Sequence, residues 1–259
     1  MRTKIIALAN QKGGVAKTTS TYNLATAKAL EGYKVLMVDL DAQASLTIAA
    51  GITPGDPKFE GRSSADLFDK KCDPVDSVFK VEGLGLDDKL YIIPSILDLA
   101  LVDNYINALD EKVYFLKDAC DILDEYDFDY IFLDCPPNLG IIVTNALVAA
   151  TDVIIPVKTD YLSYCGLQLI NGSIEKIKSN KRMNPDLNIL GVLATLFRST
   201  VNDNKTMLNI LNKQWSDRVL GVIKESAEIE KGVVNAFPVV INNPNCDAAK
   251  AYLEVAKKI

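Results

Sequence analysis

Short apolar runs alternate with amphipathic segments along the whole chain. This alternation is typical of repeated strand–helix–strand units, and it predicts an α/β fold with a doubly wound, mostly parallel sheet and helices on both faces. The apolar runs are rich in Val, Ile and Leu, as expected for strands that helices cover on both sides. We predict strands at residues 5–9, 35–38, 91–93, 130–133, 153–157, 189–196 and 219–223.

The segments between these strands carry apolar residues at helical spacing. They predict helices at residues 18–31, 102–125, 141–149, 166–178, 204–215 and 248–258. Residues 51–61 are rich in proline and glycine and predict a surface loop. Because no internal repeat or low-complexity linker interrupts the pattern, we expect residues 1–259 to form a single domain.

The first predicted strand runs into a turn rich in glycine and lysine, which predicts a phosphate-binding loop. Gly13 and Gly14 lack a β-carbon, so their backbone can take up positive φ and bring N–H groups against an anion. The helix that follows directs its positive end at the same place. Lys17 supplies a cation for the β- and γ-phosphates of a nucleotide, and the Thr18 hydroxyl is a natural ligand for Mg²⁺.

This loop departs from the general pattern G-x-x-x-x-G-K-[ST] at both glycines. Gln11 and Ala16 stand at those two positions. Because alanine avoids positive φ, we expect a negative φ at Ala16. A glycine turn with two solvated lysines is the alternative interpretation of this segment.

Three aspartates come at the ends of predicted strands. Asp39 and Asp41 follow the run at residues 35–38, and Asp134 follows the run at 130–133. Ligands of open parallel sheets bind at the carboxyl ends of the strands, so we expect these carboxylates beside the loop. Capping of the following turn is the alternative role for Asp39 and Asp41, and many strands end in aspartate.

The segment Lys12-Gly-Gly-Val-Ala-Lys17-Thr-Thr19 resembles the deviant Walker A loop, K-G-G-x-x-K-[ST], of the ParA/MinD family of dimeric ATPases. The resemblance implies a P-loop fold, ATP hydrolysis, and ATP and Mg²⁺ as cofactors. It implies that Lys17 acts on the nucleotide of its own subunit and that Lys12 reaches the nucleotide of the partner subunit. The nucleotide-binding residues that it implies are Lys12, Gly13, Gly14, Val15, Ala16, Lys17, Thr18 and Thr19.

The aspartate segments fit the same family. The stretch that holds Asp39 and Asp41 resembles its V-D-x-D-x-Q segment, which implies that Asp39 helps to hold the Mg²⁺ shell and that Asp41 orients the attacking water. The stretch that ends at Asp134 resembles a Walker B segment, which implies that Asp134 holds Mg²⁺ through a water. With Thr18, the implied metal-site residues are therefore Asp39 and Asp134, and the implied catalytic residues are Lys12, Lys17 and Asp41.

Over nearly its whole length the chain is similar to the small ParA/Soj-type partition ATPases, which lack an amino-terminal helix-turn-helix domain. The chain starts at its first strand, so we expect it to lack that domain too. In these relatives ATP drives a sandwich dimer that binds DNA nonspecifically, and a ParB-type centromere-binding protein stimulates hydrolysis. The resemblance implies the same homodimer, DNA binding and ParB-type partner here, in plasmid or chromosome partition.

The charge of the chain bears on DNA binding. Its formal net charge is −6, so attraction to DNA requires a local basic patch. The relatives carry arginines in regions where this chain mixes acidic residues with its cations. The candidate cations are Arg198, Lys205, Lys224 and Lys231, the cluster Lys176, Lys178, Lys181 and Arg182, and the cluster Lys250, Lys257 and Lys258. Ordinary solvated surface charges are the alternative.

The composition of the chain limits which catalytic groups, cysteine states and membrane segments are possible. The chain has no histidine, so catalysis must rest on carboxylates, lysines, backbone amides and a bound cation. The five cysteines lack C-x-x-C spacing and predict reduced thiols. No apolar run reaches the roughly 18 residues of a membrane span, which predicts no transmembrane segment and a cytoplasmic location. The family resemblance implies association with the nucleoid in the ATP-bound state.

Three other function classes compete with partition. A MinD-like ATPase that cycles on membranes needs a carboxyl-terminal amphipathic helix, and the last predicted helix is short and contains Glu254. An amidotransferase-like ligase of the same superfamily needs a domain for ammonia delivery, for which no sequence remains. A regulatory nucleotide switch that acts through a protein partner stays an alternative.

Overall fold

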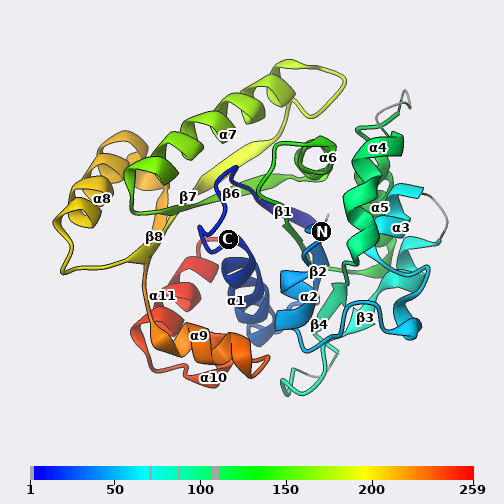
Figure 1. The fold of residues 1–259 in the computed structure, drawn as a ribbon, viewed down its shortest axis with the longest axis horizontal. Coiled ribbons are helices and arrows are strands. Elements are labelled where there is room, and N and C mark those ends of the chain that lie inside the picture. Colours follow the sequence, from blue (N-terminus) through cyan, green and yellow to red (C-terminus); the bar gives the residue numbers. More distant parts are fainter. Residues whose placement is uncertain (1–2, 70–71, 87, 107–110) are drawn as a thin grey trace.

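A computed structural model describes residues 3–69, 72–86, 88–106 and 111–259 of the chain. Within these residues one eight-stranded sheet runs through the molecule in the order β3-β4-β2-β5-β1-β6-β7-β8 (Figure 1). The strands are β1 (Lys4–Leu8), β2 (Val35–Asp39), β3 (Phe79–Lys80), β4 (Leu90–Ile93), β5 (Tyr130–Asp134), β6 (Asp152–Lys158), β7 (Asn188–Phe197) and β8 (Val219–Lys224).

The sheet confirms the predicted mostly parallel arrangement. All neighbouring strands pair in parallel except β3, which is antiparallel to β4 at the edge. Each of the seven predicted runs contains or overlaps a strand. The two-residue β3 is too short to produce a periodic pattern, and it was not predicted.

Helices cover both faces of this sheet. One face is covered by α3 (Ser64–Asp69), α4 (Val102–Ile106), α5 (Phe115–Leu123), α6 (Ile141–Ala149), α7 (Tyr161–Ser179) and α8 (Asn202–Trp215). The other is covered by α1 (Lys17–Leu30), α2 (Ser45–Ala49), α9 (Ala227–Val234), α10 (Val239–Asn242) and α11 (Asp247–Ala256). Figure 1 shows α6 and α7 on one side of the central strands and α1 and α11 on the other.

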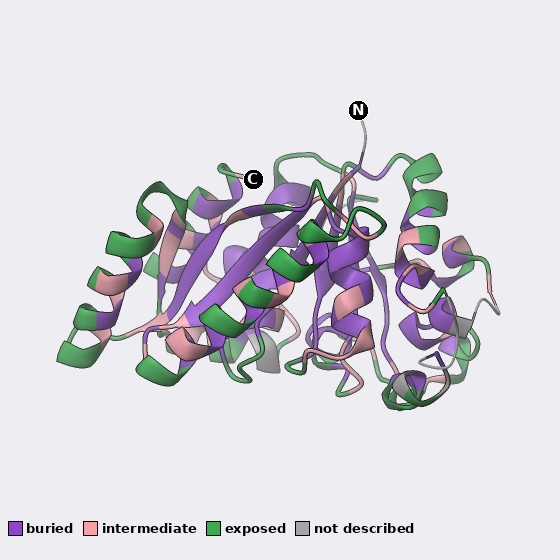
Figure 2. Cartoon of the chain, turned by 90° about the horizontal axis from the view of Figure 1, so that it is seen from above, coloured by how far each residue is buried: buried purple, intermediate pink, exposed green. Residues whose placement is uncertain are grey.

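The side-chain alternation of β1 shows how one strand serves both layers. Ile5 and Ala7 pack into the core under α5 and α6, whereas Ile6 and Leu8 pack under α1 and α11. Figure 2 shows the resulting distribution, with buried strands in the middle and exposed residues on the outer faces of the helices. No helix in the described part of the chain is both long and apolar enough to cross a bilayer.

The single helix predicted at residues 102–125 is wrong. The structure has α4 and α5 there, with a turn at Tyr114 between them, and residues 107–110 of the prediction lie outside the described residues. Asn145 of α6 explains the turn, because its side chain accepts from Leu116 N (3.3 Å) and donates to Lys112 O (2.7 Å). These hydrogen bonds from α6 satisfy backbone N–H and C=O groups of the turn. In a continuous helix such groups would bond within the helix itself.

Other helix boundaries also differ from the prediction. Helix α7 begins at Tyr161, five residues before the predicted start, because the carboxylate of Asp160 caps it by accepting from Ser163 N (2.8 Å). The region predicted as a loop at residues 51–61 contains a 3₁₀ turn, Pro57–Phe59, whose Phe59 is buried. The helices α2, α3, α9 and α10 have at most eight residues each, and the sequence pattern did not reveal them.

Candidate functional site

Two residues of the loop between β1 and α1 have a left-handed backbone conformation. Gly14 has a φ of 70° and Ala16 a φ of 60°. The expected negative φ at Ala16 is therefore wrong. Ala16 occupies the position just before α1, and its carbonyl accepts from Ser20 N (3.0 Å), so the left-handed turn is what allows the loop to enter the helix.

The two lysines of the loop have opposite environments. Lys17 is only 8% exposed, and its ammonium donates to the carbonyl oxygen of Lys12 at 3.4 Å. Burial lowers the pKa of Lys17, and the nearby carboxylates of Asp134 and Asp41 act in the opposite direction. Lys12 is exposed, and its side chain has no ion pair within the described ranges.

Asp39 and Asp134 are direct neighbours, because they occupy paired positions at the carboxyl ends of β2 and β5. Leu8 of β1, which leads into the loop, pairs with Asp134 on its other side. Thr21 donates to Oδ1 of Asp134 (3.1 Å), while Oδ2 is buried and has no hydrogen-bond partner among the described residues. Burial and the neighbouring Asp39 raise the pKa of Asp134 to about 8.

Asp39 lies behind the site, fully buried, with both carboxylate oxygens engaged. Oδ1 accepts from Asp41 N (3.2 Å), and Oδ2 accepts from the backbone N–H (2.8 Å) and hydroxyl (2.7 Å) of Thr47. Burial raises the pKa of Asp39 to about 6. Asp39 therefore supports the backbone of Asp41 and the helix α2, and its place in a metal shell stays a prediction.

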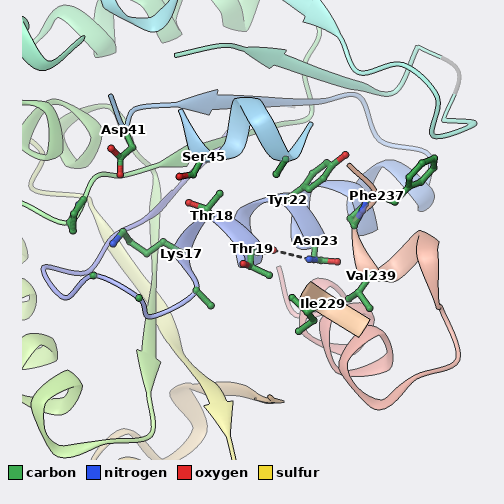
Figure 3. Close-up of a pocket in the computed structure, with 16 residues that line it drawn as sticks. Lys17, Thr18, Thr19, Tyr22, Asn23, Asp41, Ser45, Ile229, Phe237 and Val239 are labelled. Carbon is green, nitrogen blue, oxygen red and sulfur yellow. Dashed lines mark hydrogen bonds between the residues drawn. The ribbon is translucent and has the colours of Figure 1, made fainter. Parts of the chain in front are cut away.

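A cavity of about 320 Å³ opens beside the loop. Figure 3 shows its two ends: Lys17, Thr18 and Asp41 at one end, Tyr22 and Phe237 at the other. The predicted loop residues Gly13, Gly14, Ala16, Lys17, Thr18 and Thr19 line it, whereas Lys12 and Val15 do not. Val15 is buried, and its carbonyl accepts from the Thr195 hydroxyl (3.1 Å).

Sequence reasoning missed the apolar end of this cavity. It is lined by side chains from α1, α2 and the α9–α10 region, namely Tyr22, Asn23, Ala49, Ile229, Phe237, Pro238 and Val239. Asn23 joins these elements, because its carboxamide donates to Thr19 O (2.8 Å) and accepts from Val240 N (3.2 Å). Asn23 and Val240 are 217 residues apart in the sequence, and no local motif marks the pair.

Most of the cations predicted as DNA contacts near β8 and the carboxyl terminus are neutralised by acidic partners. Arg198 pairs with Glu225, and Lys224 with Asp247 (2.8 Å). Two further ion pairs join Lys231 to Glu228 and Lys257 to Glu254. The cluster Lys176, Lys178, Lys181 and Arg182 at the end of α7 has no ion pair within the described part of the chain.

A parallel sheet whose first strand enters a lysine-containing glycine loop, with carboxylates at the ends of two adjacent strands, defines a P-loop nucleotide-binding protein. A family model described as AAA domain matches residues 3–189. The sporulation initiation inhibitor protein Soj of Bacillus subtilis is 32% identical over 257 residues, which cover 99% of this chain and 98% of Soj. The chain belongs to the ParA/Soj family of P-loop ATPases, as its loop and aspartate segments predicted.

Solved structures agree with this assignment. A putative plasmid partition protein from Borrelia burgdorferi bound to AMPPNP has a TM-score of 0.83 and 29% identity, with 99% of this chain and 98% of that chain covered. Cobyrinic acid a,c-diamide synthase from Mycobacterium smegmatis with a bound ATP analog and magnesium has a TM-score of 0.79 and 30% identity, with 98% and 93% covered. A chain of similar length thus carries a synthase name, so length alone does not exclude a ligase.

The residues present fit a magnesium nucleotide. The buried, unpartnered Oδ2 of Asp134 and the Thr18 hydroxyl near it are oxygen donors of the kind that Mg²⁺ prefers. No cluster of three or more acidic, histidine or cysteine side chains suited to a metal occurs among the described residues. Mg²⁺ is commonly bound through one or two carboxylates together with waters and nucleotide phosphates, which these oxygen donors would allow.

Ala16→Gly tests the left-handed turn. Alanine at positive φ is disfavoured by roughly 1–2 kcal/mol, so glycine should raise the free energy of unfolding by on the order of 0.5–1 kcal/mol after its larger chain entropy is subtracted. Urea unfolding measures the change. Ala25→Gly, in the middle of α1, is the matched control and should lower the same free energy by at least about 1 kcal/mol. A loss of stability in Ala16→Gly would contradict the assigned conformation.

Asp134→Asn tests the buried carboxyl. Its pKa of about 8 in the folded state lies above the ordinary value of 3.8, so its contribution to stability is complete below about pH 4 and is lost as the pH rises towards 8. Without nucleotide and metal, the wild-type protein should therefore lose about 2 kcal/mol more than Asp134→Asn between pH 6 and pH 8. Urea unfolding at both pH values measures this difference, and equal pH dependence in the two proteins would refute it.

Proposed function

We propose that this chain is a Mg²⁺-dependent ATPase that forms an ATP-sandwich dimer, binds DNA nonspecifically and drives plasmid or chromosome partition with a ParB-type partner. The observation that carries the proposal is the separation of the two loop lysines. Lys17 is buried in the cavity of its own subunit, whereas Lys12 is exposed and outside that cavity. The proposal leaves Lys12 available to a nucleotide in a second subunit.

Within one subunit, different side chains bind the phosphates and the base, hold Mg²⁺ and orient the attacking water. The loop N–H groups and Lys17 bind the phosphates, and Tyr22 and Phe237 lie at the end of the cavity that suits the base. Thr18 and Asp134 hold Mg²⁺, which neutralises charge on the phosphates. Asp41 orients the attacking water, and Asp39 keeps the backbone of Asp41 in place.

The surface next to Lys12 supports dimer formation. Helix α7 contacts the loop at Lys12, and it exposes Tyr161, Leu162 and Leu169 by 67%, 64% and 57% of their surface. Leu162 and Leu169 are seven residues apart and therefore lie on one side of the helix. An exposed apolar surface beside a functional loop is typical of a protein interface. A cation supplied in trans can raise phosphoryl-transfer rates by about 10³–10⁵, so dimer formation would control hydrolysis.

DNA binding is the part of the proposal on which the partition role depends. The cations near β8 have acidic partners, whereas the cluster Lys176, Lys178, Lys181 and Arg182 has no ion pair among the described residues and is the candidate patch. One such patch binds DNA weakly. A dimer presents two such patches. Once one patch has bound DNA, the other is held near the same DNA at a high effective concentration.

The main alternative is a MinD-like or other regulatory nucleotide switch that acts through a membrane or protein partner. The membrane version needs a free amphipathic helix at the carboxyl terminus. Here α11 packs its apolar side into the core, where Tyr252 is buried and its hydroxyl hydrogen-bonds that of Ser20 (3.1 Å). This packing disfavours the membrane version and leaves a protein partner as the remaining alternative.

Asp41→Ala should keep ATP binding, abolish turnover and accumulate an ATP-bound dimer, because phosphate and metal contacts remain while the water-orienting carboxylate is lost. Phosphate release and light scattering with size exclusion measure the two properties. Lys17→Ala is the comparison variant, and it should lose ATP binding itself. Normal hydrolysis by Asp41→Ala, or loss of its ATP binding, would show that Asp41 has a different role.

DNA retention should require ATP. We expect negligible binding to nonspecific DNA without nucleotide or with ADP, clear binding by the Asp41→Ala dimer with ATP, and a steep decrease with salt. In that background, Lys181→Glu with Arg182→Glu should weaken binding at least tenfold. Lys231→Glu with Lys257→Glu changes the net charge equally at ion-paired lysines and should have a smaller effect. Binding that is equal or absent in all nucleotide states at low salt would remove the partition role and favour the switch.

A further inference from the structure

The backbone of Lys12 is held from outside the phosphate-binding loop. Asn10 follows β1 and is 2% exposed. Its side-chain N–H group donates to Pro156 O of β6 (2.7 Å), and its side-chain oxygen accepts from Lys12 N (3.0 Å). Because both ends of the carboxamide are engaged, Asn10 ties the lysine to the neighbouring strand and does not face a ligand.

Helix α7 lies directly against Asn10 and Lys12. A β-carbon at Gly166 would lie 3.1 Å from Oδ1 of Asn10 and 3.3 Å from Cβ of Lys12. Both distances are shorter than ordinary van der Waals contact. Neither neighbour is the free end of a flexible side chain, since one is a hydrogen-bonded amide and the other is the first atom of the lysine side chain. A side chain at position 166 would therefore have to push Asn10 or Lys12 away by a few tenths of an ångström.

We propose that Asn10 and Gly166 are positioning residues for Lys12. Asn10 fixes the lysine backbone, and Gly166 lets α7 press on it, so that a displacement of α7 moves Lys12 in the same direction. The exposed Leu162 and Leu169 flank Gly166 on α7, so a partner that covers them would act on Lys12 through this contact. The inference rests on the proposed function, because it takes Lys12 as the lysine that serves the other subunit.

Gly166→Ala is the direct test, and α7 supplies its own control. Gly172 lies in the same helix, and a β-carbon there would have nothing within 4 Å. Both substitutions raise helix propensity equally, so a difference between them reports the contact with the loop. An error in placing a reacting group of about 1 Å can reduce rates by about 10²-fold, and the forced shift here is a fraction of that. We expect kcat to fall about tenfold in Gly166→Ala, with ATP affinity unchanged, and no change in Gly172→Ala.

A double-mutant cycle distinguishes positioning of Lys12 from general damage. In a Lys12→Ala background, Gly166→Ala should leave the residual turnover unchanged, because the group that it displaces is already absent. Asn10→Ala should show the same pattern, which keeps the test available if Gly166→Ala does not fold. ATP affinity is measured with a fluorescent nucleotide at the same time, since a collapsed loop would lose it.

Three results would overturn the inference. Wild-type kcat in Gly166→Ala, an equal loss in Gly172→Ala, or additive losses in the Lys12→Ala background would each show that the contact does not position Lys12. Wild-type turnover in Lys12→Ala alone would instead refute the role of Lys12 in the proposed function. The two failures are therefore distinguishable.

Discussion

Two carboxylates lie side by side beneath the phosphate-binding loop, and their burial is the constraint on which the site depends. The strand register pairs Asp39 with Asp134, and each raises the free energy of ionising the other. Asp39 accepts three hydrogen bonds, whereas one oxygen of Asp134 has no hydrogen-bond partner in the part of the chain that the structure describes. Lys17 is buried near Asp134. A cation that binds there would favour the ionised form of Asp134 and displace its proton, so part of the nucleotide site is stabilised only when it is filled.

The same constraint explains how α2 is placed. Thr47 donates twice to Asp39, and its hydroxyl also accepts from Ser95 N (2.9 Å) after β4. A buried carboxylate therefore organises the start of a short helix and the end of a neighbouring strand. Because Asp39 also accepts from Asp41 N, the position of the half-buried second aspartate depends on the buried first one. The spacing of one residue between them thus has a structural reason besides any metal contact.

Local patterns predicted seven of the eight strands in the described sheet, the loop and the three aspartates, because each of these features depends on neighbours in sequence. The features that local patterns did not predict depend on contacts between residues that are far apart in the sequence. The turn before α5 is held by Asn145, the cation Arg198 is paired with Glu225, and the base end of the cavity joins Tyr22 to Phe237. The left-handed Ala16 is a local feature, yet propensity gave the wrong sign of φ because the need to enter α1 outweighed it.

The loop contains two lysines five residues apart, and the fold buries the second and leaves the first exposed. Lys17 starts α1 and turns into the cavity, where burial lowers its pKa and fixes it beside Asp134. Lys12 lies before the left-handed turns at Gly14 and Ala16, and Asn10 holds only its backbone, so its side chain stays in solvent. Because its backbone is already held, ordering Lys12 on a second molecule would cost only the entropy of its side chain, about 0.5–1.5 kcal/mol.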